Sequence, residues 1–175
     1  MTTSREILAL VPIGDDPEVG RWLAALEDGR RDTLRELEGV TPEMLDWYSD
    51  APRNSIGTLL YHIALIEAAW VTEEMLALTD EPSDLAALLP WADRDDGGHL
   101  SPADGLSLDA HVRRLAGVRA WVLEHLSSMT NEEFHRVRSF ERYEAAPDWA
   151  IHHILQHEAE HRSHIASLRD TFAAR

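Results

Sequence analysis

The stretch from Pro147 to Phe172 reads as one long amphipathic helix whose buried face carries histidines. Steps of three and four residues place on that face Ile154, His157, His161, Ile165, Leu168 and Phe172. Burying an imidazole without a partner costs roughly 1–3 kcal/mol. Residues four apart on a helix lie about 5–6 Å apart at Cβ, close enough for two imidazoles to share one metal ion. The stretch therefore predicts a core-facing helix that carries two metal ligands.

Three further segments have helical spacing and predict long helices. The first runs from about Pro17 to Glu38, the second from Ile56 to Leu78, and the third from about Leu108 to Ser128. Asn54 or Ser55 is the expected cap of the second helix, and Ser107 that of the third. Residues 79–106, rich in Asp, Pro and Gly, favour a lid or a bundle crossover with a short helix at 84–89. Residues 134–140 favour an extended segment. Without a convincing strand pattern, the sequence predicts an all-α fold, an antiparallel four-helix bundle in one domain over residues 1–175.

The second of these helices repeats the combination of apolar residues and a histidine. Its inward face carries Leu59, His62, Ile66 and Trp70. A bundle can bring His62 to His157 and His161, and three neutral imidazoles resemble a catalytic zinc site with one open coordination position. The alternative is that these histidines pack against carboxylates in the core and bind no metal. Glu67 falls off the face of His62 and is not expected to be a ligand.

The remaining histidines have weaker patterns. His153 precedes His157 by one helical turn. It could hydrogen-bond a metal ligand or shuttle protons near the metal, or it could be a polar residue at the edge of the buried face with no such role. His164 is left out because Ile165 is the better inward position. Loops or exposed faces are expected for His99, His111 and His135.

Residues 157–161 also match the zinc-protease pattern H-E-x-x-H, in which Glu158 would be the general base. That interpretation needs a third ligand downstream and strands before the helix. Only 14 residues follow His161, none of them Glu, and His164 is too close for the longer metalloprotease spacing. The sequence therefore argues against a protease.

Composition narrows the classes of function. The net charge is −16 and all 16 basic residues are arginine, so the surface repels phosphate backbones and no nucleic-acid partner is expected. The chain has no cysteine, so a metal must be held by His, Asp or Glu. It lacks an apolar run of about 18 residues and a signal-peptide pattern, so we expect no membrane partner and a cytoplasmic location.

Two motifs resemble those of the DinB/YfiT-like superfamily of metal-binding four-helix bundles. NSIGTLLYHIALIEAAW resembles its second-helix signature and HHILQHEAEHRSHI its last-helix signature, although Ser163 stands where members often have glycine. The resemblance covers about Pro17 to Phe172, and the family's metal triad falls on His62, His157 and His161. It implies a divalent metal (zinc, nickel or iron), which three imidazoles also suit. It further implies a low-molecular-weight thiol, because relatives include transferases using mycothiol, bacillithiol or glutathione, and a maleylpyruvate isomerase.

These observations favour a metal-dependent enzyme in which the ion lowers the pKa of a thiol or water that attacks a small-molecule substrate. Thiol transfer is favoured by the resemblance, and a metal-dependent hydrolase is the alternative reaction. A non-catalytic metal-binding or stress-response protein would instead have a full coordination sphere. A thiol pocket would use polar or basic residues such as Arg53, Arg113 or Arg162. An exposed apolar face on the first or third helix would support a homodimer.

Overall fold

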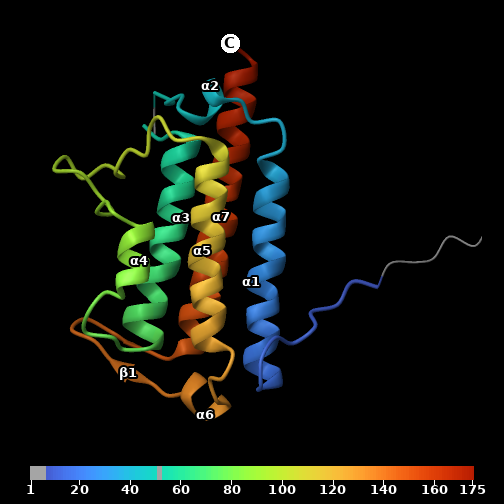
Figure 1. Ribbon diagram of the computed structural model, residues 1–175, viewed down its shortest axis with the longest axis vertical. Helices are drawn as coiled ribbons and strands as arrows, with labels where there is room; N and C mark the ends of the chain where they lie inside the picture. The colour runs from blue at the N-terminus through green and yellow to red at the C-terminus, as the bar shows by residue number, and fades with distance from the viewer. Residues whose placement is uncertain (1–6, 51–52) are drawn as a thin grey trace, which may run out of the picture.

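Four long helices lie side by side in the computed structural model, which describes residues 7–50 and 53–175 (Figure 1). They are α1 (Pro17–Glu36), α3 (Ile56–Trp70), α5 (Leu108–Leu126) and α7 (Pro147–Ala173). Helix α7 packs against α1 and α3, and α5 packs against α3 and α1. The prediction of an all-α helical bundle is confirmed.

The direction of each helix explains the long connection in the middle of the chain. In Figure 1, α1 and α7 run upward, whereas α3 and α5 both run downward. The neighbours α3 and α7 are therefore antiparallel, as expected, while α3 and α5 are parallel. Parallel neighbours need a connection that returns along the bundle. Residues 76–107, which include α4 (Ser83–Leu88), make this return, so the segment is a crossover.

Side-chain caps begin three of the long helices. At α1, Asp16 Oδ1 accepts hydrogen bonds from the backbone N–H groups of Glu18 (2.8 Å) and Val19 (3.1 Å). Ser55 Oγ accepts from the N–H of Thr58 at α3, so Ser55 rather than Asn54 is the cap. The same role falls to Ser107 at α5. These bonds satisfy N–H groups that the first helical turn leaves without an intrahelical partner.

The second long helix ends before the predicted Leu78. It continues from Trp70 into one π-helical turn, η1 (Val71–Met75), in which the N–H of Leu76 donates to the carbonyl of Val71 at 2.9 Å. Ala77 then adopts a φ of 52°, in the left-handed region that ends helices. Residues 76–78 therefore belong to the crossover. No periodic pattern signals a π turn, which adds one residue to a helical turn.

The remaining elements are short and lie at the ends of the bundle. Helix α2 (Pro42–Leu45) precedes α3, and α6 (Asn131–Phe134) follows α5. Strand β1 (Arg138–Ser139) pairs antiparallel with β2 (Glu144–Ala145) just before α7. Only the last part of the segment expected to be extended over residues 134–140 is a strand, because α6 ends with the buried side chain of Phe134.

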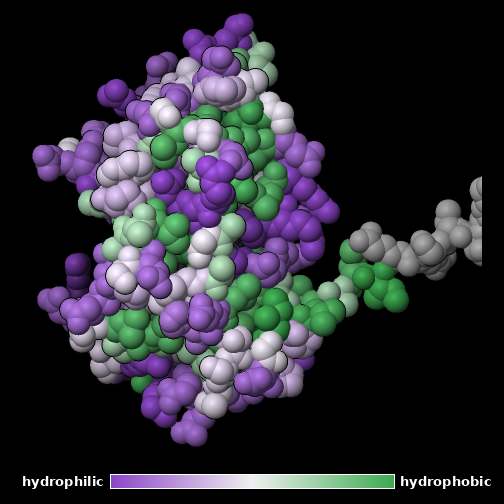
Figure 2. Space-filling model, in the orientation of Figure 1, coloured by the Kyte–Doolittle hydropathy of each residue, from purple (hydrophilic) through white to green (hydrophobic). Residues whose placement is uncertain are grey.

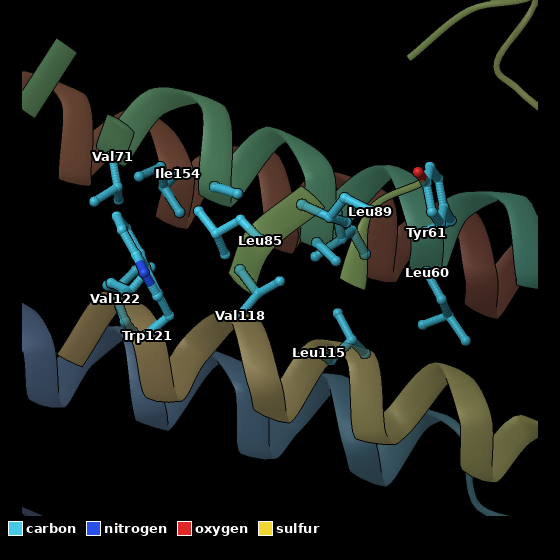
Figure 3. Close-up of a cluster of buried hydrophobic side chains, with 14 of the residues drawn as sticks. Leu60, Tyr61, Val71, Leu85, Leu89, Leu115, Val118, Trp121, Val122 and Ile154 are labelled. Atoms are coloured by element: carbon cyan, nitrogen blue, oxygen red, sulfur yellow. The ribbon is translucent and has the colours of Figure 1, made fainter. Parts of the chain in front are cut away.

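Part of the core fills the space between α3, α4, α5 and α7 with apolar side chains (Figure 3), and α1 adds buried residues such as Leu23 and Leu26 to the same core. Leu60, Leu115 and Val118 meet there, and Leu85 of α4 closes the cluster from the crossover. Among the described residues, no helix is both long and apolar enough to cross a membrane. The core thus fixes α3 and the crossover against each other, and both contribute to the site described next.

The segment before α1 leaves the bundle and is apolar. Ile7 is 88% exposed, and Leu8 and Val11 are also largely exposed. Figure 2 shows this segment as a green extension of a surface on which hydrophobic and hydrophilic areas alternate in this view. Large apolar side chains in such a position are typical of a contact surface.

Candidate metal centre

Three imidazoles converge between α3 and α7. Nε2 of His157 lies 3.1 Å from Nε2 of His62 and 3.0 Å from Nε2 of His161. One nitrogen from each of the three rings lies within 4.8 Å of the others, which makes the group able to hold a metal ion. The structure thus brings together all three histidines that the sequence predicted as ligands.

The nitrogens are arranged as ligands of a common ion would be. Tetrahedral ligands at a Zn–N distance of about 2.0–2.1 Å lie roughly 3.3–3.4 Å apart, close to the separations from His157. Hydrogen bonding alone satisfies the group poorly, because a single Nε2 proton of His157 cannot point at both neighbouring nitrogens. A cation would accept a lone pair from every ring.

Burial keeps the three rings neutral. Burial, with smaller effects of the neighbouring His161 and His62, lowers the pKa of His157 to about 3. Burial and His62 likewise lower the pKa of His161 to about 4. The pKa of His62 is also lowered by burial, although Asp93 acts in the opposite direction. At neutral pH the rings therefore carry free lone pairs, which metal binding requires.

Asp93, a crossover residue that sequence reasoning missed, holds His62 in place. Its Oδ1 lies 2.7 Å from Nδ1 of His62, and its Oδ2 lies 3.3 Å from Nε of Arg94. A carboxylate at Nδ1 fixes the proton there and leaves Nε2 free to bind a metal, a common arrangement around metal-binding histidines. The only sequence feature that could have indicated this role is that Asp93 is an acidic residue in a connection long enough to suggest a function.

Open space lies beside the three imidazoles. The three rings line a hollow of about 430 Å³ whose other walls come mainly from α3, α7 and the crossover. The other residues lining it are Asn54, Ile66, Trp70, Asp93, Arg94, Leu100 and His153. A small molecule can therefore approach the group, as a site with an open coordination position requires.

Glu158 of the H-E-x-x-H motif is turned away from the histidines. It is buried between Arg30, whose Nε donates to Oε1 at 2.7 Å, and Arg119, whose Nη2 is 3.4 Å from Oε2. Glu67 accepts from the same two arginines, at 2.6 and 2.5 Å. We call Arg30, Glu67, Arg119 and Glu158 the ionic quartet; α1, α3, α5 and α7 supply one residue each. Both carboxylates therefore face the two arginines and not the three histidines, which disfavours Glu158 as a general base and Glu67 as a ligand.

Four other histidines lie outside the converging group. His153 packs against the rings of Trp70 and Trp149, and its ring centroid lies 6.4 Å from that of His157. His164 is exposed, and its Nδ1 lies 3.3 Å from Nδ1 of His161, outside the converging nitrogens. Exposed positions are confirmed for His99 and His135.

The expectation of an exposed His111 was wrong. It lies on α5 with 1% of its surface exposed, and neither ring nitrogen has a hydrogen-bond partner within the described part of the chain. Its Nε2 would be 3.2 Å from a Cβ placed on Gly57, so the absent side chain at Gly57 makes room for the ring. Burial, with a smaller effect of Arg114, lowers the pKa of His111 to about 4.

The arginines suggested for a thiol pocket lie elsewhere. Arg113 pairs with Asp109 on the exposed side of α5, and Arg162 Nη1 donates to the carbonyl of Gly29 in α1. Arg53 lies over the ring of Tyr48. None of the three is among the described residues that line the hollow beside the histidines; Arg94 is.

A helical bundle with three converging neutral histidines that could hold a metal ion fits a metal-binding class of protein. The sequence family called the DinB superfamily matches residues 25–165, and the chain belongs to this superfamily. No curated protein matches the chain.

Proposed function

We propose that this chain is a metal-dependent enzyme that transfers a low-molecular-weight thiol to a small electrophile. The observation that carries the proposal is the hollow of about 430 Å³ beside three neutral imidazoles. A zinc, nickel or iron ion held there would lower the pKa of a thiol in its open position. Mycothiol, bacillithiol and glutathione are the candidate thiols, on the chain's membership of the superfamily.

The residues around the site have separate roles in this proposal. His62, His157 and His161 would hold the ion, and Asp93 orients His62 through Nδ1. Ile66, Trp70 and Leu100 would supply apolar contacts to the bound molecule. Asn54 supplies a neutral amide for hydrogen bonds to the bound molecule.

The geometry argues against the other functions that the sequence left open. A non-catalytic metal protein would have a filled coordination sphere, whereas this group faces a hollow. Core histidines would pair with carboxylates, but among described residues the hydrogen-bond partners of His157 and His161 are histidines. Hydrolysis by a metal-bound hydroxide stays the alternative reaction, although Glu158 would not be its base because the ionic quartet holds that carboxylate.

We also propose that the protein is cytoplasmic and acts as a homodimer. The apolar residues Ile7, Leu8 and Val11 support the dimer, because the described part of the chain leaves them uncovered. A second copy would bury them at a symmetric interface.

Elemental analysis of the untagged protein tests the metal site. We expect about one equivalent of a transition metal in the wild type and a loss of it in both His62→Ala and His157→Ala. The loaded protein is then assayed with each thiol and a chlorinated aromatic electrophile. Product that contains the thiol supports transfer, and product formed at the same rate without thiol indicates hydrolysis. A wild-type protein that stays metal-free after incubation with zinc and nickel would contradict the proposal of a metal-dependent enzyme.

A further inference from the structure

A cluster of aromatic rings borders the hollow beside the three histidines. The rings of His153 and Trp149 are stacked, with centroids 5.3 Å apart and an interplanar angle of 6°. The ring of Trp70 lies 4.5 Å from that of His153 and 5.4 Å from that of Trp149. We call Trp70, His153 and Trp149 the aromatic ridge. Trp70 and His153 line the histidine hollow, so the ridge is one of its walls.

The far side of the ridge borders a second hollow. Trp149 is 50% exposed, and it lines a space of about 280 Å³ together with Val137 and Tyr143. The hydroxyl of Tyr143 donates to Oε1 of the buried Glu74 at 2.5 Å, which fixes the tyrosine ring against this space. The ridge thus presents an apolar surface between a candidate metal centre and a second, largely apolar hollow.

Neither the ridge nor the histidine hollow offers a free positive charge. Among the described residues that line the histidine hollow, Arg94 is the one with a permanent positive charge. Its guanidinium group forms an ion pair with Asp93 and donates a hydrogen bond to the carbonyl of Gly98 at 3.0 Å. The second hollow contains the carboxylate residue Glu144. This charge distribution disfavours an anionic group on the ridge.

We propose that the aromatic ridge binds a flat, uncharged aryl group of the substrate, so that the enzyme acts on aryl-bearing electrophiles. Aromatic rings prefer offset-stacked or edge-to-face contacts with other rings, which a group of three mutually contacting, partly exposed rings provides. The ridge also continues directly from the wall of the candidate metal centre. The inference rests on the proposed function for the reacting end of the substrate.

Two probes with the same metal-binding head test this proposal. Acetohydroxamate and 2-naphthohydroxamate differ only in the flat apolar group, and the visible spectrum of the cobalt(II)-loaded protein reports the entry of either. We expect the naphthyl compound to bind at least about tenfold more tightly to the wild type, because its ring is removed from water against the ridge.

Substitution of Trp149 locates the effect. We expect Trp149→Ala to bring the two affinities within about threefold without changing acetohydroxamate binding, and Trp149→Phe to restore most of the preference. Trp91→Ala is the matched control. Its ring is 39% exposed and packs on Tyr61 beside a different hollow, so the preference should remain. Thermal melts of each variant confirm that it is folded.

Each contrary result has a distinct meaning. Equal affinities in the wild type would overturn the aryl site while the open metal position stands. If neither hydroxamate changes the cobalt spectrum, the proposed function fails; quenching of tryptophan fluorescence by 2-naphthamide then tests the ridge alone, and no difference between wild type and Trp149→Ala overturns it. A change of oligomeric state in Trp149→Ala, with no aryl preference in the wild type, would show an interface between copies instead.

Discussion

Asp93 shows how a single loop carboxylate prepares a histidine for metal binding. We expect Asp93→Asn to weaken zinc binding by about 10–100-fold, because the ring of His62 loses the partner that fixes its proton at Nδ1. Competition against a chromophoric chelator measures the affinity. Asp96→Asn removes an exposed carboxylate of the same loop and should change the affinity by less than about twofold. Equal effects of the two substitutions would contradict the role given to Asp93.

His111 should make the stability of the protein depend on pH. Its pKa is about 4 in the folded chain and 6.5 ordinarily, so below pH 6.5 the unfolded chain binds more protons and stability falls as pH falls toward 4. Compared with His111→Leu, the metal-free wild type should lose on the order of 3 kcal/mol between pH 7 and pH 4. Urea unfolding at each pH measures this. Identical pH profiles for the wild type and His111→Leu would contradict this prediction.

For single residues, the sequence predicts the position of a side chain when that position depends on helical spacing alone. His157 and His161 are fixed relative to each other by one turn of α7, and His62 shares an apolar face with Leu59 and Ile66. Asp93 was not predictable, because its contact with His62 depends on how the crossover closes over α3. The burial of His111 was missed for a similar reason: it depends on the space that Gly57 leaves on a neighbouring helix.

The ionic quartet ties the four long helices together through their interior. Burial alone would raise the pKa of Glu67, and Arg119 and Arg30 outweigh that effect and lower it. We expect Glu67→Gln to reduce the free energy of unfolding by roughly 3–5 kcal/mol, because two buried guanidinium groups lose the charge of a shared partner. Chemical denaturation measures the loss.

An exposed ion pair provides the control for the quartet. Arg35 and Asp32 are paired on the surface of α1, so Asp32→Asn should cost at most about 1 kcal/mol. If Glu67→Gln costs no more than that, the quartet does not stabilise the bundle. Buried charges of this kind also favour one register of the helices over others in some proteins.

The elements differ in how visible they are in the sequence. Helices α1, α5 and α7 follow from apolar periodicity with a proline or a capping residue at their starts, and their ends lie within about two residues of expectation. The π turn at Val71–Met75 has no such signal. The two-residue strands β1 and β2 are also too short for a period-two pattern to appear.

For the whole molecule, the proposed ion would act as a cross-link between α3 and α7. Zinc at 100 times its dissociation constant should raise the free energy of unfolding by about 2.7 kcal/mol, or the melting temperature by roughly 5–11 °C. A thermal melt with and without zinc measures the change. The increase should vanish in His62→Ala and persist in His99→Ala. A zinc effect that survives in His62→Ala would place the ion elsewhere.

The apolar segment before α1 gives a second test at this scale. Sedimentation velocity should give the mass of two chains for the wild type and of one chain for the variant Ile7→Asp/Leu8→Asp, because buried charges oppose association. The exposed Glu73→Asp change is a control that should leave the mass unaltered. A monomeric wild type would contradict the proposed homodimer.

The arrangement of the helices was only partly visible in the sequence. Four long helical segments predict a bundle, but a connection of about thirty residues suits either a lid or a return path, and these give different directions for α5. Leu85 from α4 packs into the core and so holds the crossover against the bundle, a contact between distant parts of the chain that the sequence of the helices alone does not reveal.

The distance along the chain between the converging histidines has a consequence for biosynthesis. His62 and His157 are 95 residues apart. At about 5–20 residues per second, the ribosome needs roughly 5 to 19 s to pass from one to the other. During that interval the nascent chain offers the imidazole of His62 without the two from α7. The proposed three-histidine site would therefore form only after α7 packs against α3. The bound metal would then mark chains that have completed folding.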